Sequence, residues 1–247
     1  MTAADVVFPG DGVALRGYCA ATGGAGRVPA LVLVPDVRGL SDFYRDVARR
    51  FADAGFVTLA VDLYSREGTP ELPDMESVSR RIRTLPDTRV LADLAAAVRH
   101  LAARDDVRAE AIGITGFCLG GQYSLMAACT VPGLAACVAW YGMLRYAETN
   151  AVKPESPLSM APRLACAYLG LFGAEDGLIP RADVEELRAT LARTGRPHEI
   201  VEYPGAGHAF MNETRADVYR PEAAADSWRR ALAFLRTHLA GGPSRTR

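Results

Sequence analysis

A cysteine held between glycines is the residue whose position most clearly predicts chemistry. The segment GFCLGG at 116–121 directly follows an apolar run at 111–115. This G-x-nucleophile-x-G spacing predicts a sharp strand-to-helix turn that exposes Cys118 and aims neighbouring N–H groups at a developing oxyanion. A thiol at a helix N-terminus also feels the positive end of the helix dipole, which favours a nucleophilic thiolate. The alternative is a small buried hydrophobe, which is what we expect of Cys19, Cys129, Cys137 and Cys166.

A histidine and an aspartate follow the cysteine at positions suited to a base and its orienting acid. His208 lies in the glycine-rich segment 205–210, after the last predicted strand. Asp176 follows the preceding strand; Asp before Gly also marks turns, and Glu175 is its rival for the acid role. The order nucleophile, acid, base predicts a triad in which Asp176 orients His208, and His208 maintains the Cys118 thiolate and later activates water.

The elements that must position these residues alternate along the chain. Strands are predicted at 13–20, 30–34, 56–61, 112–116, 134–140, 164–172 and 198–203, and helices at 43–54, 74–85, 89–103, 119–129, 182–193 and 223–239. The alternation predicts an α/β fold, a mainly parallel sheet with helices on both faces and an antiparallel first strand. We expect a single domain over 1–240 and a frayed tail at 241–247.

Ligands bind outside the carboxyl ends of the strands in sheets of this kind. Three segments lie at such ends, namely 35–38, Cys118 and 173–176. The polar, Gly/Pro-rich stretch 65–73 is predicted to be a loop beside the site. The glycine-rich stretch 23–26 is predicted to be a hairpin connection.

Composition excludes several classes of function. A net charge of −1 and a pI near 6.4 argue against a nucleic-acid surface or a polybasic membrane anchor. The uncharged stretch 111–144 is interrupted by glycines, Ser124 and Pro132, so it reads as buried strands and a helix rather than a membrane span. The five cysteines form no C-x-x-C pair and the histidines lack metal-ligand spacing. We therefore expect no metal, no disulfide framework and, without a signal-peptide pattern, a cytoplasmic location.

Taken together, these segments resemble the dienelactone hydrolase family of α/β-hydrolases. The similar pieces are 35–40, 45–50, 61–64, 116–121, 173–176 and 205–210, which span nearly the whole chain. The resemblance implies the α/β-hydrolase fold and cofactor-free cleavage of small cyclic enol-ester lactones through a covalent acyl-thiol intermediate. It also implies an oxyanion hole formed by the backbone N–H groups of Leu119 and Val37.

Two departures from the family pattern concern the substrate. Asp36 stands where the family usually has a Glu that contacts the resting thiol, so it either gates Cys118 or is a turn residue. Asn212 stands where members that take anionic dienelactones place an Arg, which removes one side of a carboxylate clamp. Arg38, Arg80 or Arg81 could replace it, so we expect neutral esters to be processed at least as well as carboxylated ones. The candidate thiol-gating or substrate-contacting residues are Asp36, Arg38, Tyr64, Arg81, Phe210 and Asn212.

Other functions remain compatible with the same residues. An acyl-transfer or ring-rearranging biosynthetic enzyme would use the same triad with water excluded. A non-catalytic ligand-binding α/β-hydrolase would share the fold, because fold alone does not specify function. The predicted partner is a small-molecule ester or lactone, with the chain acting as a monomer or homodimer.

Overall fold

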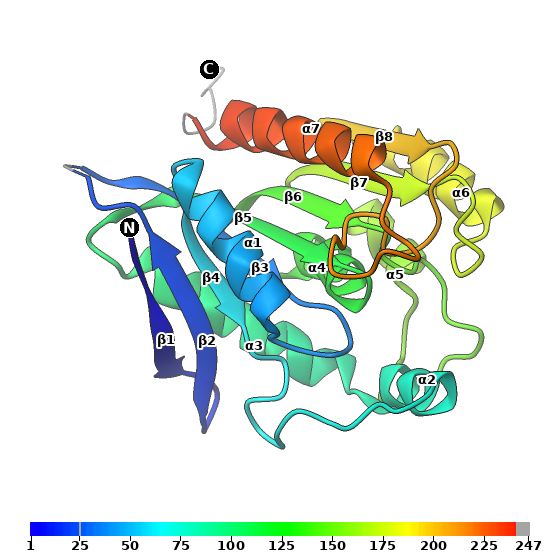
Figure 1. Ribbon diagram of the computed structural model, residues 1–247, viewed down its shortest axis with the longest axis horizontal. Helices are drawn as coiled ribbons and strands as arrows, with labels where there is room; N and C mark the ends of the chain where they lie inside the picture. Colours follow the sequence, from blue (N-terminus) through cyan, green and yellow to red (C-terminus); the bar gives the residue numbers. More distant parts are fainter. Residues whose placement is uncertain (25, 241–247) are drawn as a thin grey trace.

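The computed structural model describes residues 1–24 and 26–240, and a twisted eight-stranded sheet runs through its centre (Figure 1). Across the sheet the strands follow the order β1-β2-β4-β3-β5-β6-β7-β8. β1 and β2 pair antiparallel, as do β2 and β4, whereas every pair from β4 to β8 is parallel. The prediction of a mainly parallel sheet is confirmed. The strands are β1 (Thr2–Pro9), β2 (Ala14–Ala21), β3 (Val28–Val34), β4 (Val57–Val61), β5 (Val107–Phe117), β6 (Leu134–Trp140), β7 (Ala167–Gly173) and β8 (His198–Tyr203).

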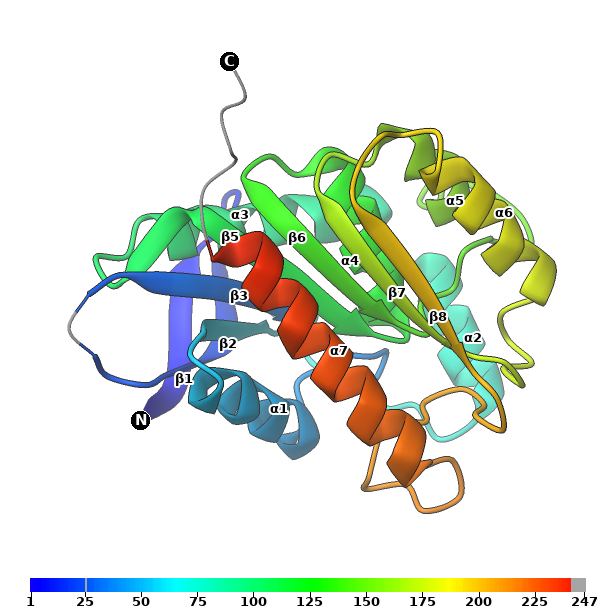
Figure 2. The same ribbon diagram turned by 90° about the horizontal axis from the view of Figure 1, so that it is seen from above.

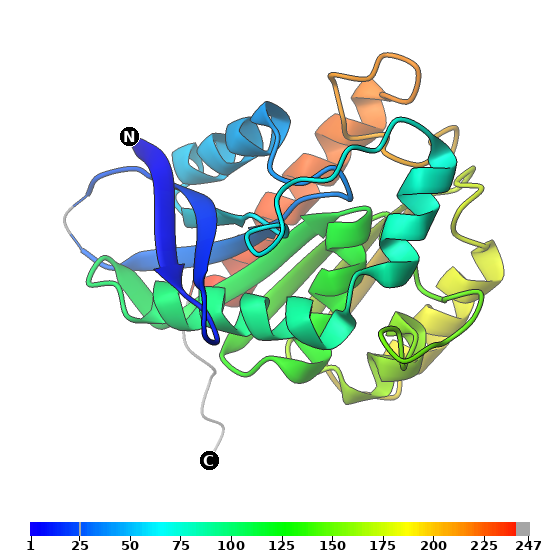
Figure 3. The same ribbon diagram turned by 90° about the horizontal axis from the view of Figure 1, so that it is seen from below.

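Helices cover both faces of the sheet. Figure 2 shows α1 and α7 on one face, and Figure 3 shows α3 and α4 on the other, with α5 and α6 beside α4. The helices are α1 (Asp42–Asp53), α2 (Met75–Thr84), α3 (Asp87–Ala102), α4 (Leu119–Thr130), α5 (Pro157–Met160), α6 (Arg181–Leu191) and α7 (Pro221–Leu239), with a short 3₁₀ turn at Ala161–Arg163. Because both faces are covered, the central strands are mostly apolar, and every residue of β4 and β7 is buried.

The N-terminal part of the sheet differs from the expectations. β1 was not expected, because it lies at the sheet edge with most side chains exposed and therefore shows no apolar alternation. The expectation of a hairpin at 23–26 is wrong, because β2 pairs with β1 and β4 and never with β3. The hairpin instead joins β1 to β2, closed by a hydrogen bond from the Gly10 N–H to the Val13 carbonyl at 2.8 Å.

The structure does not test the predicted C-terminal tail, but it does bear on the question of a membrane-spanning helix. The tail expected at 241–247 lies outside the residues that the structure describes. Within 1–24 and 26–240, no helix combines the length and the apolar character needed to cross a bilayer.

Candidate active site

The turn between β5 and α4 holds Cys118 in a strained backbone conformation. Cys118 has φ 55° and ψ −117°, which is costly for a residue other than glycine, and its side chain is half-buried. The turn depends on glycines at its flanks. A Cβ on Gly116 would lie 2.2 Å from the Gly120 carbonyl oxygen, and a Cβ on Gly120 would lie 2.0 Å from the Val34 carbonyl oxygen. This strand–turn–helix geometry is the one that the glycine spacing predicts.

Backbone strain gathers around one cavity. Cys118, Tyr141 (φ 39°) and Ala209 (φ 64°) are the non-glycine residues with positive φ in the described part of the chain. All three line a cavity of about 740 Å³ beyond the carboxyl ends of the strands. Because such conformations persist only where the surroundings enforce them, their clustering marks this cavity as the candidate site. Its volume lies within the range of about 300–1,000 Å³ typical of small-molecule pockets.

The cavity has two sides. Strand-end loops and the start of α1 form one side, with Asp36, Val37, Arg38, Tyr44, Cys118, Leu119, His208 and Asn212. α2 and the segment that follows β6 form the other, with Met75, Val78, Ser79, Ile82, Arg83, Met143, Arg145, Tyr146, Glu148 and Lys153. Figure 3 shows α2 standing beyond the carboxyl ends of the central strands, apart from the helices that cover the sheet.

His208 and Asp176 are brought together from the loops that follow β8 and β7. His208 Nδ1 lies 2.8 Å from Asp176 Oδ2, and the Asp176 side chain is fully buried. Asp176 Oδ1 accepts a hydrogen bond from the Leu178 N–H at 2.9 Å, which fixes the carboxylate. Glu175 is exposed and does not line the cavity. The structure therefore pairs the histidine with Asp176 and not with its rival.

The second ring nitrogen of His208, Nε2, is not engaged in this pair. It is buried and has no hydrogen-bond partner within the described residues. Burial by itself opposes a charge on the ring, but the neighbouring Cys118 and the hydrogen bond with Asp176 outweigh it and raise the pKa of His208 to about 10. The surroundings of the ring therefore favour the imidazolium form of His208.

Val37 and Leu119 are the two residues whose N–H groups are predicted to form the oxyanion hole. Both line the cavity, and neither N–H donates in the turn, loop or side-chain hydrogen bonds of residues 1–24 and 26–240. The Tyr64 hydroxyl donates a hydrogen bond to the Val37 carbonyl at 2.6 Å, which fixes the loop that contains Val37. Tyr64 itself is fully buried and does not line the cavity.

Asp36 makes the turn contact considered for it and also lines the cavity, and its gating of Cys118 stays a prediction. Its Oδ1 accepts a hydrogen bond from the Arg38 N–H at 2.8 Å, which is a turn contact, yet its side chain lines the cavity. Burial raises the pKa of Asp36, while the Arg38 N–H and the Tyr44 hydroxyl partly oppose that shift. Tyr44 lies on α1 and was not among the predicted site residues.

The other predicted site residues separate into two groups. Arg38 and Asn212 line the cavity, and the Asn212 Oδ1 accepts hydrogen bonds from the Thr214 N–H and hydroxyl at 3.0 and 2.6 Å. Arg81 points away from the cavity, because it pairs with Glu67 and covers the Tyr64 ring. Arg80 pairs with Glu76, and Phe210 is buried beneath Tyr141; neither lines the cavity.

Sequence reasoning missed several lining residues. Arg83 lies in the cavity and forms no ion pair within the described chain. Tyr141 directly follows β6, so its place at a carboxyl strand end was a usable signal. Met143 and Tyr146 lie in a polar loop without periodicity and gave none.

A second ion pair closes the far side of the cavity. Lys153 Nζ lies 2.6 Å from Asp87 Oδ1 and 2.8 Å from the Tyr123 hydroxyl, and both charged side chains are almost fully buried. The Tyr146 hydroxyl donates to Asp87 Oδ2 at 2.9 Å and accepts from Gln122 Nε2 at 2.9 Å. This cluster joins the start of α3, the first turns of α4 and the loop after β6.

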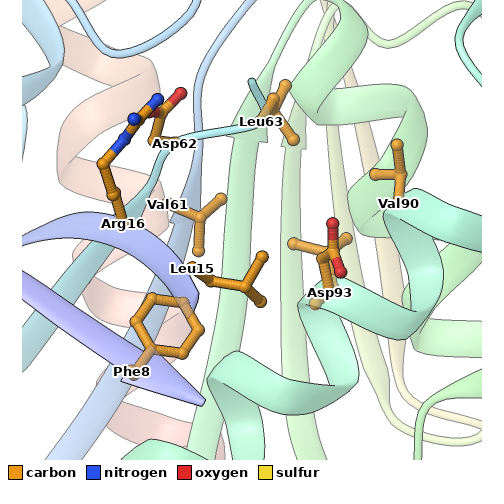
Figure 4. A pocket seen from close by; sticks show the side chains of 9 residues that line it. Phe8, Leu15, Arg16, Val61, Asp62, Leu63, Val90 and Asp93 are labelled. Atoms are coloured by element: carbon orange, nitrogen blue, oxygen red, sulfur yellow. The ribbon is translucent and has the colours of Figure 1, made fainter. Parts of the chain in front are cut away.

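A much smaller void lies between the β1–β2 hairpin and α3 (Figure 4). Its volume of about 10 Å³ is barely enough for one water molecule. Asp62 and Asp93 at its edge are paired with Arg16 and Arg66. In the part of the chain that the structure describes, no group of three potential metal ligands is present. The large cavity is therefore the candidate site for a substrate.

Comparison with known proteins identifies a family model and relatives that are similar to this chain in sequence. A sequence model described as "Dienelactone hydrolase family" matches residues 15–239. A Bradyrhizobium protein named "Probable 2-oxo-3-(5-oxofuran-2-ylidene)propanoate lactonase" is 39% identical over 216 residues, covering 87% of this chain and 86% of that protein. An Escherichia coli K12 protein named "Putative carboxymethylenebutenolidase" is 36% identical over 215 residues, covering 86% of this chain and 78% of that protein.

Solved structures show the same architecture. The crystal structure of a "Putative Dienelactone Hydrolase" from Klebsiella pneumoniae has a TM-score of 0.89 and 37% sequence identity, covering 95% of this chain and 98% of that chain. The α/β-hydrolase fold inferred from the sequence is confirmed by this likeness.

Proposed function

The chain belongs to the dienelactone hydrolase family and is an ester or lactone hydrolase, and from this premise we propose that it works through a Cys118–His208–Asp176 triad. The observation that carries the proposal is the pairing of His208 with buried Asp176 beside the strained Cys118 turn, on a single cavity. The substrate is a carboxylic ester or an enol lactone, and the reaction requires no cofactor. The name of the Bradyrhizobium relative describes a lactonase, which supports a lactone.

In the first half of the reaction, the Cys118 sulfur attacks the substrate carbonyl carbon. The N–H groups of Val37 and Leu119 stabilise the negative oxygen of the tetrahedral intermediate. The carbon–oxygen bond of the ester breaks, and protonated His208 gives its Nε2 proton to the leaving oxygen. An acyl-thioester on Cys118 remains; when the substrate is a lactone, the released oxygen stays attached to the acyl chain.

In the second half, neutral His208 takes a proton from water, and the resulting hydroxide attacks the thioester carbonyl. The carbon–sulfur bond breaks, the acid leaves and the thiolate–imidazolium pair is restored. Asp176 remains ionised, holds the ring with Nε2 toward the sulfur and stabilises the imidazolium.

Turnover of a short-chain p-nitrophenyl ester by wild type, Cys118→Ala and Cys129→Ala tests the triad. Cys118→Ala should lose activity by roughly a factor of a thousand or more, because the covalent route is removed. Cys129→Ala is the matched control, since Cys129 is buried at the end of the same helix and does not line the cavity.

Iodoacetamide labelling with peptide mass spectrometry should place the inactivating adduct on Cys118. Brief acid quenching during turnover should trap an acyl adduct on the same residue. Release of the free acid distinguishes hydrolysis from transfer to another acceptor. Substantial turnover by Cys118→Ala would contradict the proposal.

A further inference from the structure

α2 contributes apolar side chains to the cavity, and two of them, Val78 and Ile82, also pack against the protein core. Met75, Val78 and Ile82 follow the spacing i, i+3, i+7 on one face of the helix, and all three line the cavity. The opposite face carries Arg80, which pairs with Glu76, and Arg81 lies beside the stripe, where it pairs with Glu67. An amphipathic helix ordinarily buries such a stripe against other elements, but only Val78 is buried in α2.

Apolar side chains from other elements join the same cavity. Met143 lies in the loop after β6, and Leu178 lies two residues beyond Asp176. Leu178 and Met75 are 51% and 62% exposed, and they belong to the small set of large apolar side chains exposed in the described part of the chain. The others, Met1, Val7 and Val13, lie on or beside the β1–β2 hairpin. Exposed apolar groups on a concave surface mark a ligand site, and flexible Met side chains suit varied ligands.

The cavity also exceeds the needs of a small lactone. Its volume of about 740 Å³ lies in the upper half of the pocket range of about 300–1,000 Å³, where drug-sized ligands fit. The groups that would act on the carbonyl, Cys118 and His208, lie on the strand-end side. The α2 side is continuous with them and therefore remains for the rest of the substrate.

We infer that the apolar lining of the cavity, formed by Met75, Val78 and Ile82 of α2 together with Met143 and Leu178, is a subsite for a hydrocarbon or aromatic group of the substrate. This inference rests on the proposed function, because it assumes that the scissile carbonyl lies at Cys118. It assigns as substrate class the esters or lactones that carry an apolar substituent larger than a methyl group. Burial of that substituent removes both its own apolar surface and that of α2 from water.

Two matched substrate series test the subsite. One lengthens the acyl chain of p-nitrophenyl esters from acetate to hexanoate, and the other lengthens the alcohol of a common acyl group. Each fully buried methylene is worth about fourfold in kcat/KM. We expect a rise of at least about tenfold across four methylenes in one of the series, since part of each chain remains in contact with water.

The variants Met75→Gln/Ile82→Gln and, separately, Leu178→Gln should flatten that rise by about fivefold or more. Gln has nearly the helix propensity of Met, so α2 is preserved in the double variant. Leu178 is half-exposed, so its replacement leaves the fold intact. Arg80→Gln is the matched control on the opposite face of α2, and it should leave the hexanoate-to-acetate ratio unchanged.

A flat or falling profile in both series for wild type would overturn the inference, and so would a rise that all the variants retain. In either case, loss of turnover in Cys118→Ala would leave the proposed function standing. Retention of turnover in Cys118→Ala would instead refute the proposed function, so the two failures are distinguishable.

Discussion

Two buried ion pairs border the same cavity, and they differ in what they leave unpaired. In the pair of His208 with Asp176, Nδ1 is engaged at 2.8 Å, whereas Nε2 has no hydrogen-bond partner in the described chain. In the pair of Lys153 with Asp87, the ammonium also contacts the Tyr123 hydroxyl, and the second carboxylate oxygen accepts from Tyr146. The first pair leaves a ring nitrogen unengaged, as the proposed triad requires, and the second is engaged in holding three segments together.

The comparison shows how a reactive pair is distinguished from an anchoring pair. Burial of charge alone does not identify function, because both carboxylates are buried. The distinguishing features are the open nitrogen and the strained backbone at Cys118 and Ala209 beside the first pair. Burial lowers the pKa of Lys153 despite the opposing contribution of Asp87, as expected when desolvation costs more than the ion pair returns.

The largest effect is expected when Asp176, which orients His208 in the proposed triad, is replaced. Asp176→Asn should reduce kcat by about 10³- to 10⁴-fold, because the amide no longer holds the required tautomer of His208 or stabilises its imidazolium. Glu175→Gln is the matched control one residue earlier and should stay within about tenfold of wild type. Ester turnover at fixed pH measures both variants. The reverse ranking of the two variants would reassign the acid.

Disruption of the Lys153–Asp87 pair should affect the free energy of unfolding more than it affects turnover. Lys153→Met leaves the Asp87 carboxylate buried without its cation, which typically costs about 3–5 kcal/mol in free energy of unfolding. The double variant Asp87→Leu/Lys153→Met should recover part of that loss, because no uncompensated charge remains. Urea unfolding followed by circular dichroism measures both variants. If Lys153→Met were as stable as wild type but had lost turnover, the pair would belong to the reaction rather than to the scaffold.

The pKa of His208 provides a further test of the His208–Asp176 pair. Its pKa is raised from 6.5 to about 10, so its contribution to stability is fully present below pH 6.5 and is lost as the pH rises through about 10. Cys118→Ser should lower the pKa of His208 by about 1–3 units, because Cys118 makes the largest contribution that raises it.

Imidazole NMR signals followed from pH 6 to pH 11, roughly the span over which the ring should titrate, give the pKa of His208 directly. Cys129→Ser serves as the control, since it removes a buried thiol at the far end of the same helix. An unchanged pKa of His208 in Cys118→Ser would show that the sulfur carries no charge in the resting enzyme.

The contrast also explains what the sequence could predict. Cys118 and Asp176 each follow a buried strand and His208 follows the edge strand β8, so the predicted strands placed all three at their carboxyl ends. Their roles remain predictions, although the structure brings His208 and Asp176 together. The Lys153–Asp87 pair was not predicted, because its partners are 66 residues apart and Lys153 lies in a polar loop without periodicity. The sequence did not specify which arginine of α2 enters the cavity, because this depends on the rotation of the helix about its own axis. In the structure Arg83 lines the cavity, whereas Arg81 is turned toward Glu67.

The smallest expected effect concerns the charge of the substrate. Asn212 lines the cavity in place of an Arg, which removes one charge-assisted contact to an anionic ligand. Arg38 and Arg83 also line the cavity and form no ion pairs within residues 1–24 and 26–240, whereas Asp36 opposes an anion. We expect the lost contact to dominate, so that a neutral methyl ester is processed at least as well as the matching dienelactone carboxylate.

Asn212→Arg should shift the ratio of kcat/KM for carboxylate over methyl ester by about tenfold or more, the value of one charge-assisted hydrogen bond. Glu213→Gln is the matched control, because it raises the net charge by the same amount without adding a cation to the cavity. The shift in Asn212→Arg should shrink as salt is added, since dissolved ions screen the attraction between the guanidinium and the carboxylate. A strong preference of wild type for the carboxylate, also reduced by salt, would contradict the expectation. Arg38→Ala and Arg83→Ala would then identify which of the two arginines replaces the missing contact.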